Sequence, residues 1–205
     1  MAARAHEVMH PAVFRGNVHG VPPVRNLRPG YTVIHPNRDK AECKVTKAIV
    51  VLILLVSVVL MLIVTLGGWS KLEGLTPMNF LWCIVYLILA FYIWRWSRGA
   101  LPISAGLAIL LLMVVVIAAT GLSGTSWFDR SHYGFAHPQS IFGTTGLPPD
   151  FLGLIVILLI PVQVLLILFA MRGLAQGWNV EMEVPIEEAK RRGSPPVVPP
   201  KPSTA

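Results

Sequence analysis

Residues 48–66 read AIVVLILLVSVVLMLIVTL, and this stretch limits the possible folds of the chain more than any other feature. Its nineteen residues carry no charge, and Ser57 and Thr65 are the only polar side chains. An α-helix of this length spans roughly 28 Å, close to the thickness of the hydrocarbon core of a bilayer. Apolar residues would lie on every face of such a helix, so lipid is its natural environment. The stretch therefore predicts a transmembrane helix.

Further apolar stretches follow, and they give predicted spans at 48–66, 78–94, 101–122 and 151–171. The expected fold class is an all-α membrane protein with four transmembrane helices. Charged residues make up 13% of the chain, well below the share of about 25% in soluble domains. Little polar sequence is left for a separate soluble domain. We expect one four-helix transmembrane domain over 47–178, with an outer loop at 123–150.

The two ends of the chain have a different composition. Residues 1–46 form a polar, proline-interrupted leader without helical or strand periodicity, which predicts disorder. This leader is too long for the basic n-region of a signal peptide, so the first helix should stay uncleaved. Residues 179–205 begin with charged residues and end rich in proline, which predicts a disordered tail.

The distribution of basic residues predicts the orientation. Fifteen of the 17 Lys and Arg residues lie in residues 1–47, in the connection at 95–100 and after residue 171, and only Lys71 and Arg130 lie in the other two loops. By the positive-inside rule, both termini are expected in the cytoplasm of a protein of the cell membrane. The net charge of +7 is thus explained by topology and by attraction to the lipid bilayer, and no nucleic-acid partner is expected.

The predicted spans lack chemically reactive groups. They contain no Asp, Glu, Lys, Arg or His, whereas ion-coupled transporters need ionisable groups at membrane depth. The chain also lacks a G-x-S-x-G elbow, an H-E-x-x-H sequence, a glycine-rich phosphate loop and a C-x-x-C pair. No catalytic residue and no cofactor are predicted, and enzymatic activity is not favoured.

Two polar residues inside the predicted spans lie at similar depths. Counted from the cytoplasmic ends of their helices, Ser57 and Gln163 differ in depth by only a few Å. An unpaired amide is costly in lipid, so we expect Gln163 to hydrogen-bond within the bundle, with Ser57 as a candidate partner; the alternative is contact with a ligand. Pro161 removes one N–H and frees the carbonyl of Ile157, which predicts a bend in the fourth helix.

Small residues line one face of the third predicted helix. Ala100, Ser104 and Ala108 are spaced by four and would lie on one side of it. Such stripes let two helix backbones approach closely, so this face should pack on another helix rather than on lipid. The partner helix could belong to the same chain or to another subunit.

The outer loop holds the remaining candidate ligands. Asp129, His132 and His137 supply side chains that bind metals, but their spacing matches no zinc or haem pattern. The loop could instead lie on the membrane surface or dock a partner, since loops longer than about 12–15 residues are often functional. No metal site is assigned.

These observations favour a non-catalytic role by elimination. The expected function is that of an accessory, assembly or scaffold subunit of a larger membrane complex, bound to another membrane protein or to itself. The alternative is a small-molecule binding or transport protein with a site between the outer loop and the fourth helix. A membrane-bound enzyme would require a metal on the candidate ligands of the outer loop.

Overall fold

The computed structural model describes residues 30–72, 75–120 and 138–191. Contacts within the chain divide it into two compact units. Residues 40–178 form one unit, here called the bundle. The residues before 40 and those after 178 form the other, here called the flanking unit.

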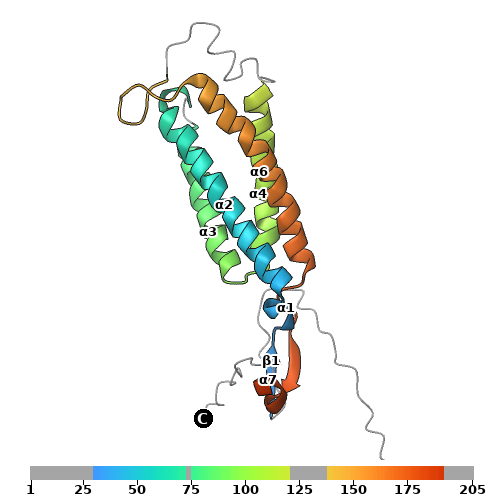
Figure 1. Cartoon of the computed structure of the whole chain (residues 1–205). Coiled ribbons are helices and arrows are strands. Elements are labelled where there is room, and N and C mark those ends of the chain that lie inside the picture. The colour runs from blue at the N-terminus through green and yellow to red at the C-terminus, as the bar shows by residue number, and fades with distance from the viewer. Residues whose placement is uncertain (1–29, 73–74, 121–137, 192–205) are drawn as a thin grey trace, which may run out of the picture. The chain divides into compact units, whose positions relative to one another are not determined.

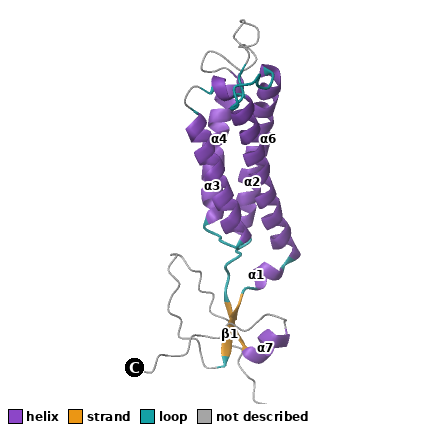
Figure 2. Cartoon of the chain, turned by 90° about the vertical axis from the view of Figure 1, so that its left-hand side faces the viewer, coloured by secondary structure: helices purple, strands orange, loops and turns teal. Residues whose placement is uncertain are grey.

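Four long helices build the bundle: α2 (Ala41–Gly67), α3 (Thr76–Trp94), α4 (Ala100–Thr120) and α6 (Pro149–Ala175). They run alongside one another in both views (Figures 1 and 2). A short 3-10 helix, η1 (Trp69–Lys71), follows α2. All four long helices are long and apolar enough to cross a membrane. Among the described residues, this confirms the four predicted apolar helices of spanning length, and it fits a multi-pass membrane protein.

Helix α6 is the centre of the packing. It packs extensively against both α2 and α4, and α2 also packs against α3, whereas the contact between α3 and α4 is smaller. Leu54, Leu101 and Leu166 are fully buried where these helices meet. On the outside, large apolar side chains such as Leu52 and Leu168 are each 60% exposed. An apolar exterior around an apolar core is what a bilayer requires of a helical bundle.

The first and last spans are longer than hydropathy indicates. Helix α2 begins at Ala41 rather than at residue 48, and α6 extends from Pro149 to Ala175 rather than over 151–171. In the first turns of α2, Glu42 and Lys44 are exposed. Helix formation needs no apolar side chains, so a helix continues where charged residues can reach water, and a hydropathy pattern ends too early.

The flanking unit contains a two-stranded antiparallel sheet. Strand β1 (Tyr31–Ile34) pairs with β2 (Met182–Pro185), and both are drawn as orange arrows in Figure 2. In this pairing Tyr31 lies opposite Pro185. Two short helices, α1 (Pro36–Asp39) and α7 (Ile186–Arg191), complete it.

The described parts of this unit, residues 30–39 and 179–191, form strands and helices where disorder was expected. Ile34, Val184 and Ala189 are buried together, with Met182 packed against them. The segments therefore gain a small apolar core by pairing with each other across the whole chain. Periodicity within either segment alone could not indicate that gain, because each strand has only four residues.

Candidate functional site

Gln163 joins three helices at the centre of the bundle. Its Nε2 donates to the Ser57 hydroxyl of α2 (3.0 Å), and its Oε1 accepts from the Tyr86 hydroxyl of α3 (2.9 Å). The Ser57 hydroxyl in turn donates to the carbonyl oxygen of Ile53 (2.9 Å). All three side chains are fully buried, with 0% exposure. We call Ser57, Tyr86 and Gln163 the central triad.

Local helix geometry places each member of the central triad. Ser57 bonds back to the carbonyl four residues earlier, a common arrangement for hydroxyl side chains within helices, which leaves its oxygen free to accept from Gln163. Gln163 follows Pro161 by two residues, and α6 continues through this proline. Pro161 itself is exposed on the outer side. The predicted bend at Pro161 stays a prediction.

The chemistry of the central triad is that of a neutral hydrogen-bond chain. A phenol donates to an amide, the amide donates to a hydroxyl, and the hydroxyl donates to a backbone carbonyl. None of these groups carries a charge at neutral pH. The chain can hold three helices in register, because a buried polar group that loses its partner is costly.

One buried donor next to the central triad has no partner among the described residues. Nε1 of Trp82 is buried and makes no hydrogen bond of standard length and angle, although it lies near the Tyr86 hydroxyl. Trp82 precedes Tyr86 by four residues, so both side chains lie on the same face of α3. Buried unpaired donors are uncommon in native proteins and call for an explanation, such as a bound water or ligand.

A second cluster closes one end of the bundle. Trp178 is fully buried, and its ring meets that of Trp96 edge to face at 5.4 Å between centroids. Its Nε1 donates to Oε1 of Gln176 (3.1 Å), whose Nε2 donates to the Thr46 hydroxyl (3.0 Å). Nζ of Lys47 lies 4.0 Å from the centroid of the Trp96 ring. The cluster thereby fixes the end of α6 against the start of α2.

A glycine makes room for this cluster. A Cβ on Gly173 would lie 3.0 Å from the Trp178 ring and 3.3 Å from the side chain of Leu101. The absence of a side chain thus lets α6 approach both residues closely. Trp96 adopts a left-handed backbone conformation, with a φ of 66°, which is uncommon for residues other than glycine and turns the chain directly after α3.

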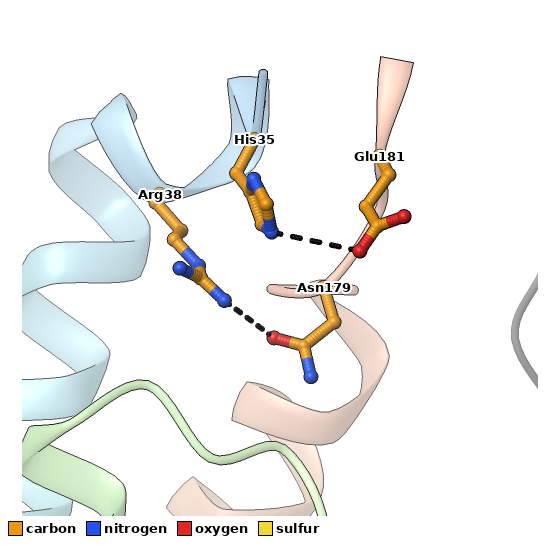
Figure 3. A network of polar contacts seen from close by, with 4 residues as sticks. All are labelled: His35, Arg38, Asn179 and Glu181. Atoms are coloured by element: carbon orange, nitrogen blue, oxygen red, sulfur yellow. Dashed lines mark hydrogen bonds and ion pairs between the residues drawn. The ribbon is translucent and has the colours of Figure 1, made fainter. Parts of the chain in front are cut away.

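The flanking unit carries an exposed polar network (Figure 3). Nη2 of Arg38 donates to Oδ1 of Asn179 (3.0 Å), and Nε2 of His35 lies 3.8 Å from Oε1 of Glu181. These contacts join the chain just before the bundle to the chain just after it. Partial burial lowers the pKa of Arg38, and the charge of Glu181 acts in the opposite direction.

The structure brings together some of the residues expected from sequence. Ser57 and Gln163 form the hydrogen bond described above. The small-residue stripe, Ala100, Ser104 and Ala108, is buried inside the bundle, and α6 is the helix that α4 packs against most extensively. The stripe therefore serves packing within the chain.

The candidate metal ligands Asp129, His132 and His137 lie outside the described residues. Within residues 30–72, 75–120 and 138–191, no group of three or more His, Cys, Asp or Glu side chains could hold a metal ion.

Sequence reasoning missed Tyr86. Its ring reads as one more apolar residue in a span, although its depth gives a signal: it lies eight residues before the end of α3, close to the depths of Ser57 and Gln163. A phenol at membrane depth needs a hydrogen-bond partner as much as an amide does.

The chain matches no family model, no curated protein and no solved structure.

Proposed function

We propose that this protein is a non-catalytic accessory, assembly or scaffold subunit of a larger complex in the cell membrane. The central triad carries the proposal. Its members hydrogen-bond to one another and join α2, α3 and α6. Polar groups used in this way stabilise a helix arrangement, and they leave no charged group at the centre of the bundle for ion or proton transfer.

The proposed topology places both termini in the cytoplasm. Four spans return the chain to the side on which it started, and the pairing of β1 with β2 supports a common side for the segments flanking the bundle. Fifteen of the 17 Lys and Arg residues lie on that side in this arrangement. The positive-inside rule then assigns that side to the cytoplasm.

The proposed partner is another membrane protein or a second copy of the chain. The small-residue stripe is occupied within the bundle, so a partner would need a different surface. The described residues offer two surfaces: the apolar exterior of the helices, and the flanking unit, where Glu187 and Lys190 are exposed. Helices in membranes associate by close packing of their surfaces, and an exposed helix or strand edge outside the membrane can dock a partner.

A pull-down with cross-linking tests the proposal. The chain would carry a C-terminal tag, be cross-linked in intact membranes and be purified in mild detergent, with a tagged unrelated four-span protein as the control. We expect one membrane protein, or the chain itself, to be cross-linked to it in constant ratio and to be missing from the control. A stable monomer without any cross-linked partner would contradict the proposal.

One observation favours a second candidate, a small-molecule binding or transport protein. The unpartnered Nε1 of Trp82 lies one helical turn from Tyr86, on the half of α3 nearer the outer loop in the proposed topology. A bound molecule with an acceptor atom would satisfy this donor. Mass spectrometry of the purified protein would then detect a small molecule that is lost in the variant Trp82→Phe, which removes the donor and keeps an aromatic ring.

A further inference from the structure

Residues 138–147 form a small hairpin directly before α6. The Ser140 N–H donates to the carbonyl of Thr144 (2.9 Å), and the Gly143 N–H donates to the carbonyl of Ser140 (3.0 Å). Gly143 has a φ of 75°, a conformation that favours glycine and closes the turn. The hydroxyls of Ser140 and Thr144 also bond to each other (2.7 Å). The turn thus satisfies several of its polar groups internally.

The hairpin is fixed to the end of α2. The Ile141 N–H donates to the carbonyl of Leu66 (3.2 Å), and the Leu147 N–H donates to that of Gly67 (3.0 Å). Two further bonds join Gln139 and Ser70: the Ser70 N–H donates to the Gln139 carbonyl (3.3 Å), and the Gln139 N–H donates to the Ser70 hydroxyl (2.8 Å).

A close backbone contact strengthens this attachment. A Cβ at Gly146 would collide with the carbonyl oxygen of Gly67 and lie 2.8 Å from that of Pro138. Only glycine allows the two backbones to approach this closely. The hairpin therefore has a defined place beside the end of the span, where Figure 1 shows it next to the last turn of α2.

The tip of this hairpin presents apolar side chains. Phe142 is 87% exposed and Ile141 is 37% exposed, whereas no exposed large apolar side chain of the four long helices exceeds 60%. No charged residue occurs between Pro138 and Pro149. The apolar side chains of the long helices are explained by lipid, whereas Phe142 and the adjacent Ile141 lie outside those helices and form an apolar tip of their own.

We infer that the hairpin tip inserts Phe142 into the lipid interface of the membrane. Three observations favour lipid. The hairpin is bonded to the last residues of a span, it carries no charge, and its turn pairs polar groups internally, which lowers the cost of leaving water. The rings of Trp69 and Phe80 meet at the same end of α2, at 6.2 Å between centroids. Aromatic side chains gather where a membrane meets water, so Phe142 extends this belt sideways from the bundle.

Spin labelling gives a direct test in liposomes of phosphatidylcholine and phosphatidylglycerol. The buried cysteines Cys43 and Cys83 would be replaced by alanine, and a nitroxide attached to Phe142→Cys or, as the matched control on the same hairpin, to Thr145→Cys. We expect the ratio of collisions with oxygen to collisions with a water-soluble nickel chelate to be several-fold higher at residue 142. Equal nickel access at both positions would overturn the inference, and so would exclusion of both reagents at 142, which would indicate a covering protein surface.

A second variant keeps the test valid if the cysteine-free protein does not fold. Phe142→Trp needs no other change, and the wild-type protein with its six tryptophans supplies the reference. We expect the added fluorescence to be quenched by lipids brominated near the headgroup and protected from acrylamide. Quenching by acrylamide alone, or protection from both quenchers, would overturn the inference.

Discussion

The central triad and the network of the flanking unit join distant parts of the chain by similar bonds in different surroundings. Ser57 and Gln163 lie 106 residues apart, and Arg38 and Asn179 lie 141 residues apart. Both hydrogen bonds measure 3.0 Å. The first is fully buried within the bundle, whereas the second is exposed to water. The two bonds are therefore matched in length, and they differ in burial and in the charge of the donor, because only Arg38 is cationic.

The difference in burial indicates which contacts stabilise the fold. When an exposed hydrogen bond is lost, water takes over both partners, and the net cost is small. When a buried bond is lost, the remaining group stays without a partner, which costs about 1–3 kcal/mol. We expect the stability of the protein to depend on the buried contacts of the bundle, and hardly on the network of Figure 3.

The largest effect is expected for Trp178→Ala. This ring is fully buried against Trp96, so its removal leaves a cavity and should lower the free energy of unfolding by about 3–5 kcal/mol. The matched control is Trp94→Ala, because Trp94 is 59% exposed at the same end of the bundle. Thermal unfolding in detergent would compare the two. Equal effects would show that burial does not determine the cost.

Gln163→Ala should cause the second-largest loss of stability. It removes a fully buried side chain and leaves the Tyr86 hydroxyl without its acceptor, at an expected cost of about 2–3 kcal/mol. Val164→Ala is the control on the same helix, because Val164 is 40% exposed on its outer surface. Unfolding in mixed micelles with increasing SDS would measure both. A Gln163 variant as stable as the Val164 variant would contradict a structural role of the amide.

Tyr86→Phe should have a smaller effect. It keeps the ring and removes only the hydroxyl that donates to Gln163, so we expect about 1 kcal/mol, the usual size for a hydrogen bond between helices in a membrane. Tyr92→Phe is the control, since Tyr92 is exposed on the same helix. The same SDS titration applies. A loss for Tyr92→Phe as large as that for Tyr86→Phe would show that burial of the hydroxyl does not determine the cost.

Arg38→Ala should have the smallest effect. Its hydrogen bond to Asn179 is exposed, and we expect a change in stability of less than about 0.5 kcal/mol. Melting of the purified protein, followed by circular dichroism, would detect a larger change. A loss similar to that for Gln163→Ala would show that the flanking unit contributes as much as the bundle.

The sequence predicts the bundle well because its signals are local and strong. Apolar stretches of nineteen residues or so give the spans directly, and counting residues from the helix ends is enough to set Ser57 opposite Gln163. The same count places Tyr86 at a similar depth, but a tyrosine near aromatic neighbours reads as apolar. Trp178 lies beyond the predicted fourth span, and its ring is nevertheless fully buried against Trp96.

The strands of the flanking unit could not be predicted from the sequence, for a different reason. Each of its strands has four residues, and the partner of each lies about 150 residues away along the chain. Its stability comes from the contact of Ile34 with Val184 and Ala189, which no periodicity within one segment reveals. Patterns within one segment predict long apolar helices, whose signal lies in their own residues. They fail for short strands that become stable only by pairing with a distant segment.

A double-mutant cycle of Tyr86→Phe and Gln163→Leu tests the central claim most directly. Leucine keeps most of the volume of Gln163 and removes its hydrogen bonds. If the two side chains serve to join α3 to α6, they share one hydrogen bond, which either single variant already breaks. The double variant should then lose about 1 kcal/mol less stability than the two single variants lose together. Single losses that add within about 0.3 kcal/mol would contradict the account, because the hydrogen bond would then contribute nothing to the fold.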